Sequence, residues 1–179
     1  AFYTDSYARD LPNGTHPLVD FLDRGALAGR LPTPLPERIA VVVHAFHLDV
    51  LGDLCSYLAH LTNDADQYVT YPDHFGSEER GYIAERFPKA QLLPVRNAGQ
   101  DVGALLALSR VVDFSTYDVV LKLHTKKGQR SPVRWRHGLL RGVLGSTSQV
   151  RDTLAAFRRD RHLILSGARQ LYLHGPSNL

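Results

Sequence analysis

The stretch LLPVRNAGQDVGALLALSRVVDFSTYDVVLKLHTKK, residues 92–127, decides the fold. It begins with an apolar run at 92–95, continues with a polar turn at 96–101 and then shows a helical pattern. A second apolar run at 119–123 ends abruptly in His124-Thr125-Lys126-Lys127. The predicted order is strand, polar loop, helix, strand, polar loop. Ligands of open α/β sheets bind where loops leave the carboxyl ends of strands, so we expect the functional site at the two polar clusters.

The helix between the two strands carries Val102, Leu105, Leu106 and Val112, which we expect on one buried side. Gly99 allows the positive φ that a tight turn requires. Asp101 follows it and is placed to cap the helix. By themselves these features predict an ordered turn, and the same side chains are also placed to meet the hydroxyls of a ligand.

The rest of the chain repeats the alternation of strand and helix. Further strands are predicted at 38–43, 67–71 and 163–165, and helices at 49–61 (capped by Asp49), 77–87, 135–144 and 146–157. Strands that alternate with helices imply right-handed crossovers and a largely parallel sheet. We therefore predict an α/β fold with three layers and a mostly parallel sheet.

Residues 1–37 differ from the rest because they hold five of the ten prolines. One or two helical turns are expected from Pro17, at the first helical position, to Leu22. We interpret this segment as an N-terminal extension or linker that packs on a neighbouring module. Residues 38–179 form the predicted sheet domain, which we expect to be truncated because the tail from Arg169 looks unfinished.

Composition limits the class of protein. A chain of 179 residues that is 44% hydrophobic suits one globular domain with a core. The sequence has no apolar run near the ~20 residues of a membrane-spanning helix and no cleavable signal pattern. The single cysteine, Cys55, excludes an internal disulfide framework. We therefore expect a reducing, cytoplasmic compartment.

Charge is distributed unevenly along the chain. Residues 1–119 hold 9 Lys/Arg and 16 Asp/Glu, whereas residues 120–179 hold 12 and 2. Such asymmetry predicts an anionic partner: a nucleotide diphosphate, a lipid phosphate at a membrane surface, or nucleic acid. The basic block begins at a strand end, which favours a phosphate site. Nucleic acid is disfavoured, because Trp135, Phe157 and Tyr172 form no stacking platform.

Several common catalytic motifs are absent. The first strand is followed by His44-Ala45-Phe46-His47 in place of G-x-G-x-x-G, which argues against a dinucleotide oxidoreductase. The sequence contains no P-loop, no G-x-S-x-G elbow and no zinc-type histidine spacing. His44 and His47 remain candidates for ligand contact because they lie at a strand end.

The segment Lys122-Leu123-His124-Thr125-Lys126-Lys127 is the most informative cluster. A lysine inside a buried strand is costly unless its ammonium escapes or is paired. His124 and Lys126 point the same way in extended geometry, so a diphosphate would gain charge-assisted bonds from both. Trp135 and Arg136 are candidates for enclosing that ligand. Asp73, which closes the second strand, is a further candidate.

At this point the sequence resembles a known family. The run RNAGQDVGALLALSRVVDFSTYDVVLKLHTKK, with WR and LLRGVLGS after it, resembles the rhamnan synthesis F family over about residues 38–168. The family is associated with glycosyl transfer in cell-surface polysaccharide assembly. The wider resemblance is to GT-A glycosyltransferases, which bind nucleotide sugars on a half-Rossmann sheet and usually hold a divalent metal with Asp-x-Asp.

The resemblance implies a metal-independent variant of that site. His124-Thr125-Lys126 stands where Asp-x-Asp is expected, and a lysine and a histidine do not form a hard-cation carboxylate site. His124 and Lys126 would neutralise the donor diphosphate instead. Phe46 would contact the nucleobase, and Asn97 and Asp101 would contact ribose or sugar hydroxyls. Gly99, in the same turn, is also a predicted donor-binding residue. The catalytic base is not assigned.

The resemblance also implies the partners. These are a nucleotide-sugar donor and a glycan or lipid-linked glycan acceptor, with no cofactor and with peripheral association at the inner face of the cell membrane. The alternative is a non-catalytic module that binds glycan or a partner protein within a larger polysaccharide-assembly protein.

Overall fold

The computed structural model describes residues 2–7, 9–30, 37–127, 132–160 and 162–168. The chain divides into two compact units, Ala1–Glu37 and Arg38–Leu179. The prolines within 31–36 and the tail from Arg169 lie outside the described residues.

The first unit is a small helical cluster built around one buried carboxylate. It contains α1 (Phe2–Tyr7), α2 (Pro17–Asp20) and the π-helical turn η1 (Phe21–Gly25). The carboxylate of Asp20, which is 1% exposed, accepts hydrogen bonds from the Tyr3 hydroxyl at 2.8 Å and Arg30 Nη1 at 2.9 Å, and also pairs with Arg24. Burying a charge is tolerated when it is paired and hydrogen-bonded. The predicted helical turns from Pro17 are confirmed.

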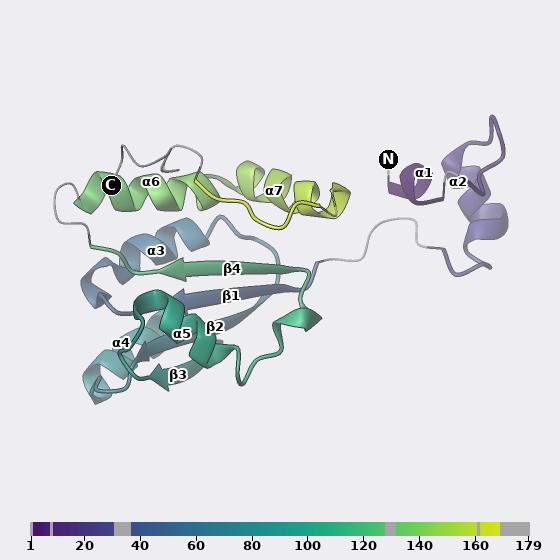
Figure 1. The fold of residues 1–179 in the computed structure, drawn as a ribbon. Helices are drawn as coiled ribbons and strands as arrows, with labels where there is room; N and C mark the ends of the chain where they lie inside the picture. Colours follow the sequence, from purple (N-terminus) through teal and green to yellow (C-terminus); the bar gives the residue numbers. More distant parts are fainter. Residues whose placement is uncertain (1, 8, 31–36, 128–131, 161, 169–179) are drawn as a thin grey trace. The chain divides into compact units, whose positions relative to one another are not determined.

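The second unit is built on a four-stranded parallel sheet (Figure 1). Its strands are β1 (Ile39–His44), β2 (Ala65–Pro72), β3 (Gln91–Val95) and β4 (Val119–His124), in the order β3-β2-β1-β4. Strand β1 is buried along its whole length, as a central parallel strand should be. In the register of β1 and β4, His44 lies beside His124. The predicted α/β fold is confirmed.

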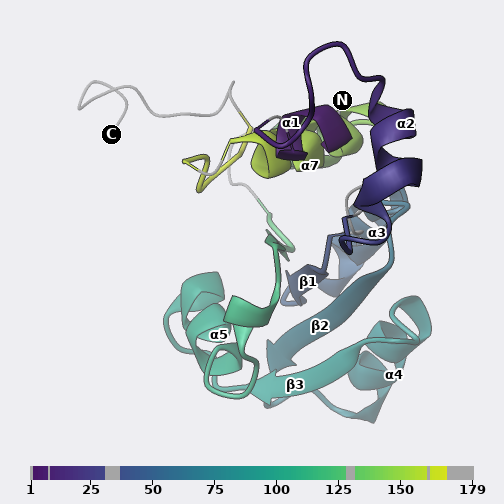
Figure 2. The ribbon, with the colours of Figure 1, turned by 90° about the vertical axis from the view of Figure 1, so that its right-hand side faces the viewer.

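Helices cover both faces of this sheet (Figure 2). They are η2 (Leu48–Val50), α3 (Leu51–Leu58), α4 (Ser77–Arg86), α5 (Gln100–Leu108), η3 (Phe114–Thr116), α6 (Pro132–Leu144) and α7 (Thr147–Arg159). Side chains of α3, α4, α6 and α7 pack with the sheet into the larger core, and α5 packs on the opposite face. The segments that follow the carboxyl ends of β1, β3 and β4 meet at one edge of the sheet.

The buried side of α5 differs from the prediction. Leu105 and Val112 pack on the core as predicted. Val102 and Leu106 are 57% and 60% exposed, and Ala104 and Leu108 are buried in their place. The helix is apolar on nearly every side, so hydrophobic spacing alone does not decide which stripe meets the sheet. The observed stripe follows positions four residues apart.

Both predicted aspartate caps are wrong. Helix α3 follows Val50, and Asp49 makes no capping bond; its carboxylate pairs with Lys127 Nζ at 2.7 Å. Helix α5 begins after Gly99 without a side-chain cap, and Asp101 pairs with Lys122. In each case a nearby ammonium group offers the carboxylate a charge-assisted bond, which is stronger than a bond to a neutral amide.

The predicted fifth strand is also wrong, because residues 163–168 have no regular secondary structure. Helix α3 links β1 to β2 on one face, and α5 links β3 back to β4 on the other. Helices α6 and α7 follow β4 on the α3 face. A parallel strand beyond β4 would then require a left-handed crossover, which is rarely formed.

Candidate functional site

A polar pocket of about 250 Å³ lies at the carboxyl ends of β1 and β4. It is bounded by the loop after β1, the turn after β3, the start of α5 and the loop after β4. The lining residues are His44, Phe46, His47, Asn97, Gln100, Asp101, His124, Thr125, Lys126 and Lys127. The two polar clusters that the sequence predicts at strand ends therefore meet in one pocket.

Thr125 joins two walls of this pocket through a single hydroxyl. Its Oγ accepts hydrogen bonds from the backbone amides of Phe46 at 2.9 Å and His47 at 2.8 Å. The same hydroxyl donates to the carbonyl of His44 at 3.3 Å, and the Thr125 amide donates to that carbonyl at 3.0 Å. Thr125 is 5% exposed. Through these bonds the hydroxyl fixes the loop after β1 against the end of β4.

The turn after β3 is held by two glycines. Gly99 has φ 75°, which favours glycine. Gly103 lies against the turn itself: a Cβ there would be 2.9 Å from the carbonyl carbon of Ala98 and closer still to its oxygen. This contact sets how closely the turn carrying Asn97 approaches the first turn of α5.

Gln100 is strained in this turn. Its φ is +54°, a region that costs a residue with a Cβ roughly 1–2 kcal/mol. The same residue lines the pocket. Strained backbone clusters at functional sites, so the conformation of Gln100 supports a role for this pocket.

Asp101 binds two side chains from β4. Its carboxylate forms an ion pair with Lys122, and its Oδ2 lies 3.6 Å from His124 Nδ1. Lys122 Nζ is in turn 3.5 Å from that same nitrogen. The pKa of Asp101 is lowered by its pairing with Lys122 and His124, although burial acts against this. The costly lysine in β4 is therefore paired, as its position in the sequence required.

The histidines of the pocket are all shifted toward the neutral form. Burial lowers the pKa of His44, whose Nδ1 is 3.0 Å from the Thr70 hydroxyl. Burial and then Lys127 lower the pKa of His47. Burial and then Lys122 lower the pKa of His124. At neutral pH the positive charge of the pocket therefore comes from its lysines.

The structure brings most of the predicted site residues together. Phe46, Asn97, Asp101, His124 and Lys126 line the pocket, and so does the further candidate His44. Gly99 shapes the turn without lining the pocket.

The other three candidates lie elsewhere. Asp73, Trp135 and Arg136 are not among the described lining residues. Arg136 instead donates to Asp53 Oδ2 at 2.9 and 2.6 Å, which ties α6 to α3. Trp135 is 39% exposed on α6, and the amide of Asp73 donates to the carbonyl of Val95 at 2.9 Å.

Three lining residues were not singled out by the sequence. For Lys127 the sequence does offer a signal, because this residue belongs to the basic cluster that follows β4. In the structure its ammonium pairs with Asp49. Thr125 has no sequence signal, since its partners lie 78 and 79 residues away. Gln100 stands out only by its φ.

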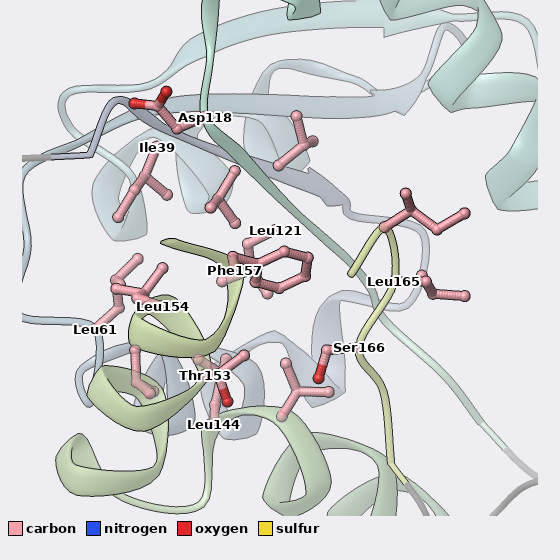
Figure 3. A pocket seen from close by; sticks show the side chains of 15 residues that line it. Ile39, Leu61, Asp118, Leu121, Leu144, Thr153, Leu154, Phe157, Leu165 and Ser166 are labelled. Atoms are coloured by element: carbon pink, nitrogen blue, oxygen red, sulfur yellow. The ribbon is translucent and has the colours of Figure 1, made fainter. Parts of the chain in front are cut away.

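A second cavity, of about 300 Å³, lies at the opposite, amino-terminal end of β4 (Figure 3). Its walls are mainly apolar and come from the start of β4, from α7 and from residues 164–166. Leu121, Leu144, Leu154 and Phe157 are among them, and Asp118 is the one charged residue that lines it within the described chain. An apolar cavity with one carboxylate does not suit a phosphate, so the polar pocket is the better candidate for an anionic ligand.

The fold and the pocket define an α/β protein of Rossmann-like architecture, with a candidate ligand site at the carboxyl edge of its parallel sheet. The sequence matches the family of Rhamnan synthesis protein F over residues 16–168, which is most of the chain, and the protein therefore belongs to that family. This membership links the protein to synthesis of the polysaccharide rhamnan.

No curated protein and no solved structure gives a significant match to the chain. Within the described part of the chain, the helices are too short or too polar to cross a membrane.

Proposed function

We propose that this chain provides the donor-binding part of a glycosyltransferase that moves a sugar, such as rhamnose, from a nucleoside diphosphate to a growing polysaccharide. The observation that carries the proposal is the meeting of His124, Lys126 and the Asn97 turn in one pocket at the strand ends. Membership of a rhamnan-synthesis family supplies the chemical context. The basic half of the chain begins at this pocket, which suits an anionic donor.

In this proposal the diphosphate lies against Lys126. No ion pair of Lys126 is found among the described residues, whereas Lys122 is paired with Asp101 and Lys127 with Asp49. When the bond between the sugar and the diphosphate breaks, the electron pair remains on a phosphate oxygen. A cation beside that oxygen stabilises the developing charge. Lys126 would thus supply the charge that a bound metal supplies in related sites, and donor binding would be metal-independent.

The remaining walls would orient the donor. The ring of Phe46 is 36% exposed at the pocket and offers an apolar face to the nucleobase. The amide side chains of Asn97 and Gln100 can exchange hydrogen bonds with ribose or sugar hydroxyls. Asp101 has a different task from the one expected, because its carboxylate already pairs with Lys122. It holds the Lys122 ammonium beside the pocket, next to His124.

Calorimetric titration with nucleoside diphosphate rhamnoses in the presence of EDTA tests this proposal. We expect binding that EDTA does not weaken. The variant Lys126→Ala should bind roughly 10- to 100-fold more weakly, because a hydrogen bond to a charged group contributes about 1.5–3 kcal/mol. Lys89→Ala removes an exposed lysine outside the pocket and should bind normally. Binding that requires a metal, or an unchanged affinity of Lys126→Ala, would refute the proposal.

A second candidate is a non-catalytic module that binds glycan. It is favoured by one observation: Asp101 is the one carboxylate among the described lining residues, and its pairing with Lys122 leaves it poorly placed as a base. Binding of rhamnan oligosaccharides by a chain that ignores every nucleotide sugar would establish this candidate instead.

A further inference from the structure

The charges around the pocket do not balance those of the proposed donor. Lys126, Lys127 and Asp101 line the pocket, and Lys122 and Asp49 lie beside it as the ion-pair partners of Asp101 and Lys127. Three lysines and two carboxylates leave one net positive charge. The diphosphate of a nucleotide sugar carries two negative charges, because both phosphates are esterified and each keeps one ionised oxygen. A bound donor therefore brings one more negative charge than the fixed charges of the pocket neutralise.

His124 is placed to supply the missing charge. Its Nδ1 lies 3.6 Å from Asp101 Oδ2, on α5, so a proton on this nitrogen has a carboxylate within reach. The other groups that act on the ring are Lys122 and Lys126 from β4 and the loop after it, and His44 from β1. Burial and Lys122 lower the pKa of His124, so the ring is neutral in the empty pocket at pH 7. An arriving dianion would reverse this balance in favour of the charged ring.

The other two histidines are less suited to the same task. His44 is only 7% exposed, and its Nδ1 is engaged by the Thr70 hydroxyl at 3.0 Å. That hydroxyl lies 3.4 Å from the carbonyl of Val43, to which it donates. A hydroxyl is a poorer partner for a positive ring than a carboxylate is. Burial and then the charge of Lys127 lower the pKa of His47, which disfavours its protonation.

We propose that a nucleotide sugar enters this pocket together with one proton, which His124 takes up and shares with Asp101. This inference rests on the proposed function. Protonation would give the diphosphate a second cation beside Lys126. Lys122 and the charged His124 would then share the negative charge of Asp101. By linkage, uptake of one proton makes the affinity rise by up to about tenfold for each unit that the pH falls.

The test is calorimetric titration of the whole chain with a nucleoside diphosphate rhamnose, in two buffers that differ in their heat of ionisation. A nucleotide sugar is the right probe because free nucleoside diphosphates have a terminal phosphate that titrates near pH 6. The difference in heat between the buffers reports the number of protons taken up. The titration is then repeated from about pH 6 to pH 8 to obtain the slope of affinity.

We expect uptake of close to one proton by the wild-type chain and by His162→Asn, which removes an exposed histidine outside the pocket. The variant His124→Asn keeps a polar atom near the Nδ1 position and cannot titrate, so its affinity should be independent of pH. Donor binding without proton uptake would overturn this inference alone. Uptake that persists in His124→Asn and disappears in His44→Asn would overturn the assignment to His124. Absence of any nucleotide-sugar binding would overturn the proposed function as well.

Discussion

Gly103→Ala should push the turn after β3 away from helix α5 and destabilise the fold. The added Cβ would lie 2.9 Å from the carbonyl carbon of Ala98, and closer still to the oxygen, so the turn must move by about 1.5 Å to reach an ordinary contact distance. Forcing atoms into a packed site costs about 1–3 kcal/mol. The exchange of glycine for alanine inside a helix returns about 1 kcal/mol. The net loss of stability is therefore up to about 2 kcal/mol.

Urea unfolding followed by circular dichroism measures this loss, and Gly81→Ala provides the matched control. Gly81 lies in α4, where an added Cβ would meet no atom within 4 Å. That variant should gain about 0.5–1 kcal/mol from helix propensity alone. Gly103→Ala should therefore be less stable than wild type and Gly81→Ala more stable. The free energies of unfolding of the two variants should differ by roughly 2 kcal/mol. If Gly103→Ala were stabilised as much as Gly81→Ala, the close approach of the turn to α5 would be wrong. Nucleotide-sugar binding should also weaken in Gly103→Ala alone, because the turn carries Asn97 into the pocket.

Three further predictions concern the same pocket. Thr125→Val should lose about 1–3 kcal/mol of stability in urea unfolding, because it leaves two partly buried amide hydrogen bonds of the loop after β1 without an acceptor. Thr125→Ser should stay within about 1 kcal/mol of wild type, and equal losses in the two variants would contradict the role of the hydroxyl. Gln100→Gly should gain about 1 kcal/mol in the same assay by relieving the positive φ, while donor binding weakens, and a loss of stability would show that the backbone there is not strained. The pKa values of His44 and His124 are lowered by burial below the ordinary 6.5, so the unfolded chain binds more protons in that range; stability of the empty protein should fall as pH drops below about 6.5, and a thermal midpoint that rises on acidification would refute this.

The fold could largely be predicted because apolar runs and polar strand ends are local features. The run at 119–123 marks β4, and a parallel sheet then brings its carboxyl end beside that of β1. This is why His124 and Lys126 could be placed in one pocket with Asn97 before any coordinates were known. The fifth strand at 163–165 could not be rejected in the same way, because its rejection depends on which face of the sheet α6 and α7 cover.

The fine structure of the pocket depends on contacts between residues far apart in the chain. Asp101 has two plausible partners, the helix that it begins and the ammonium of Lys122 21 residues away, and only the fold brings the second within reach. In the sequence Thr125 has no feature that distinguishes it from an ordinary loop residue. Its role depends on the loop after β1, whose amides donate to its hydroxyl. Local rules assign a carboxylate or a hydroxyl its usual role, and tertiary contacts then replace that role with a stronger one.

The single hydroxyl at Thr125 has a consequence for redesign of the donor preference. The hydroxyl ties the segment that carries Phe46 to the segment that carries Lys126. In the proposed donor site, recognition of the base and of the phosphates would therefore both depend on this one hydroxyl. Replacing Phe46 to suit another base would leave the phosphate contacts undisturbed only while the Thr125 hydroxyl still holds the two segments together. A variant that loses the Thr125 hydroxyl would need new contacts to position both the Phe46 segment and the Lys126 segment.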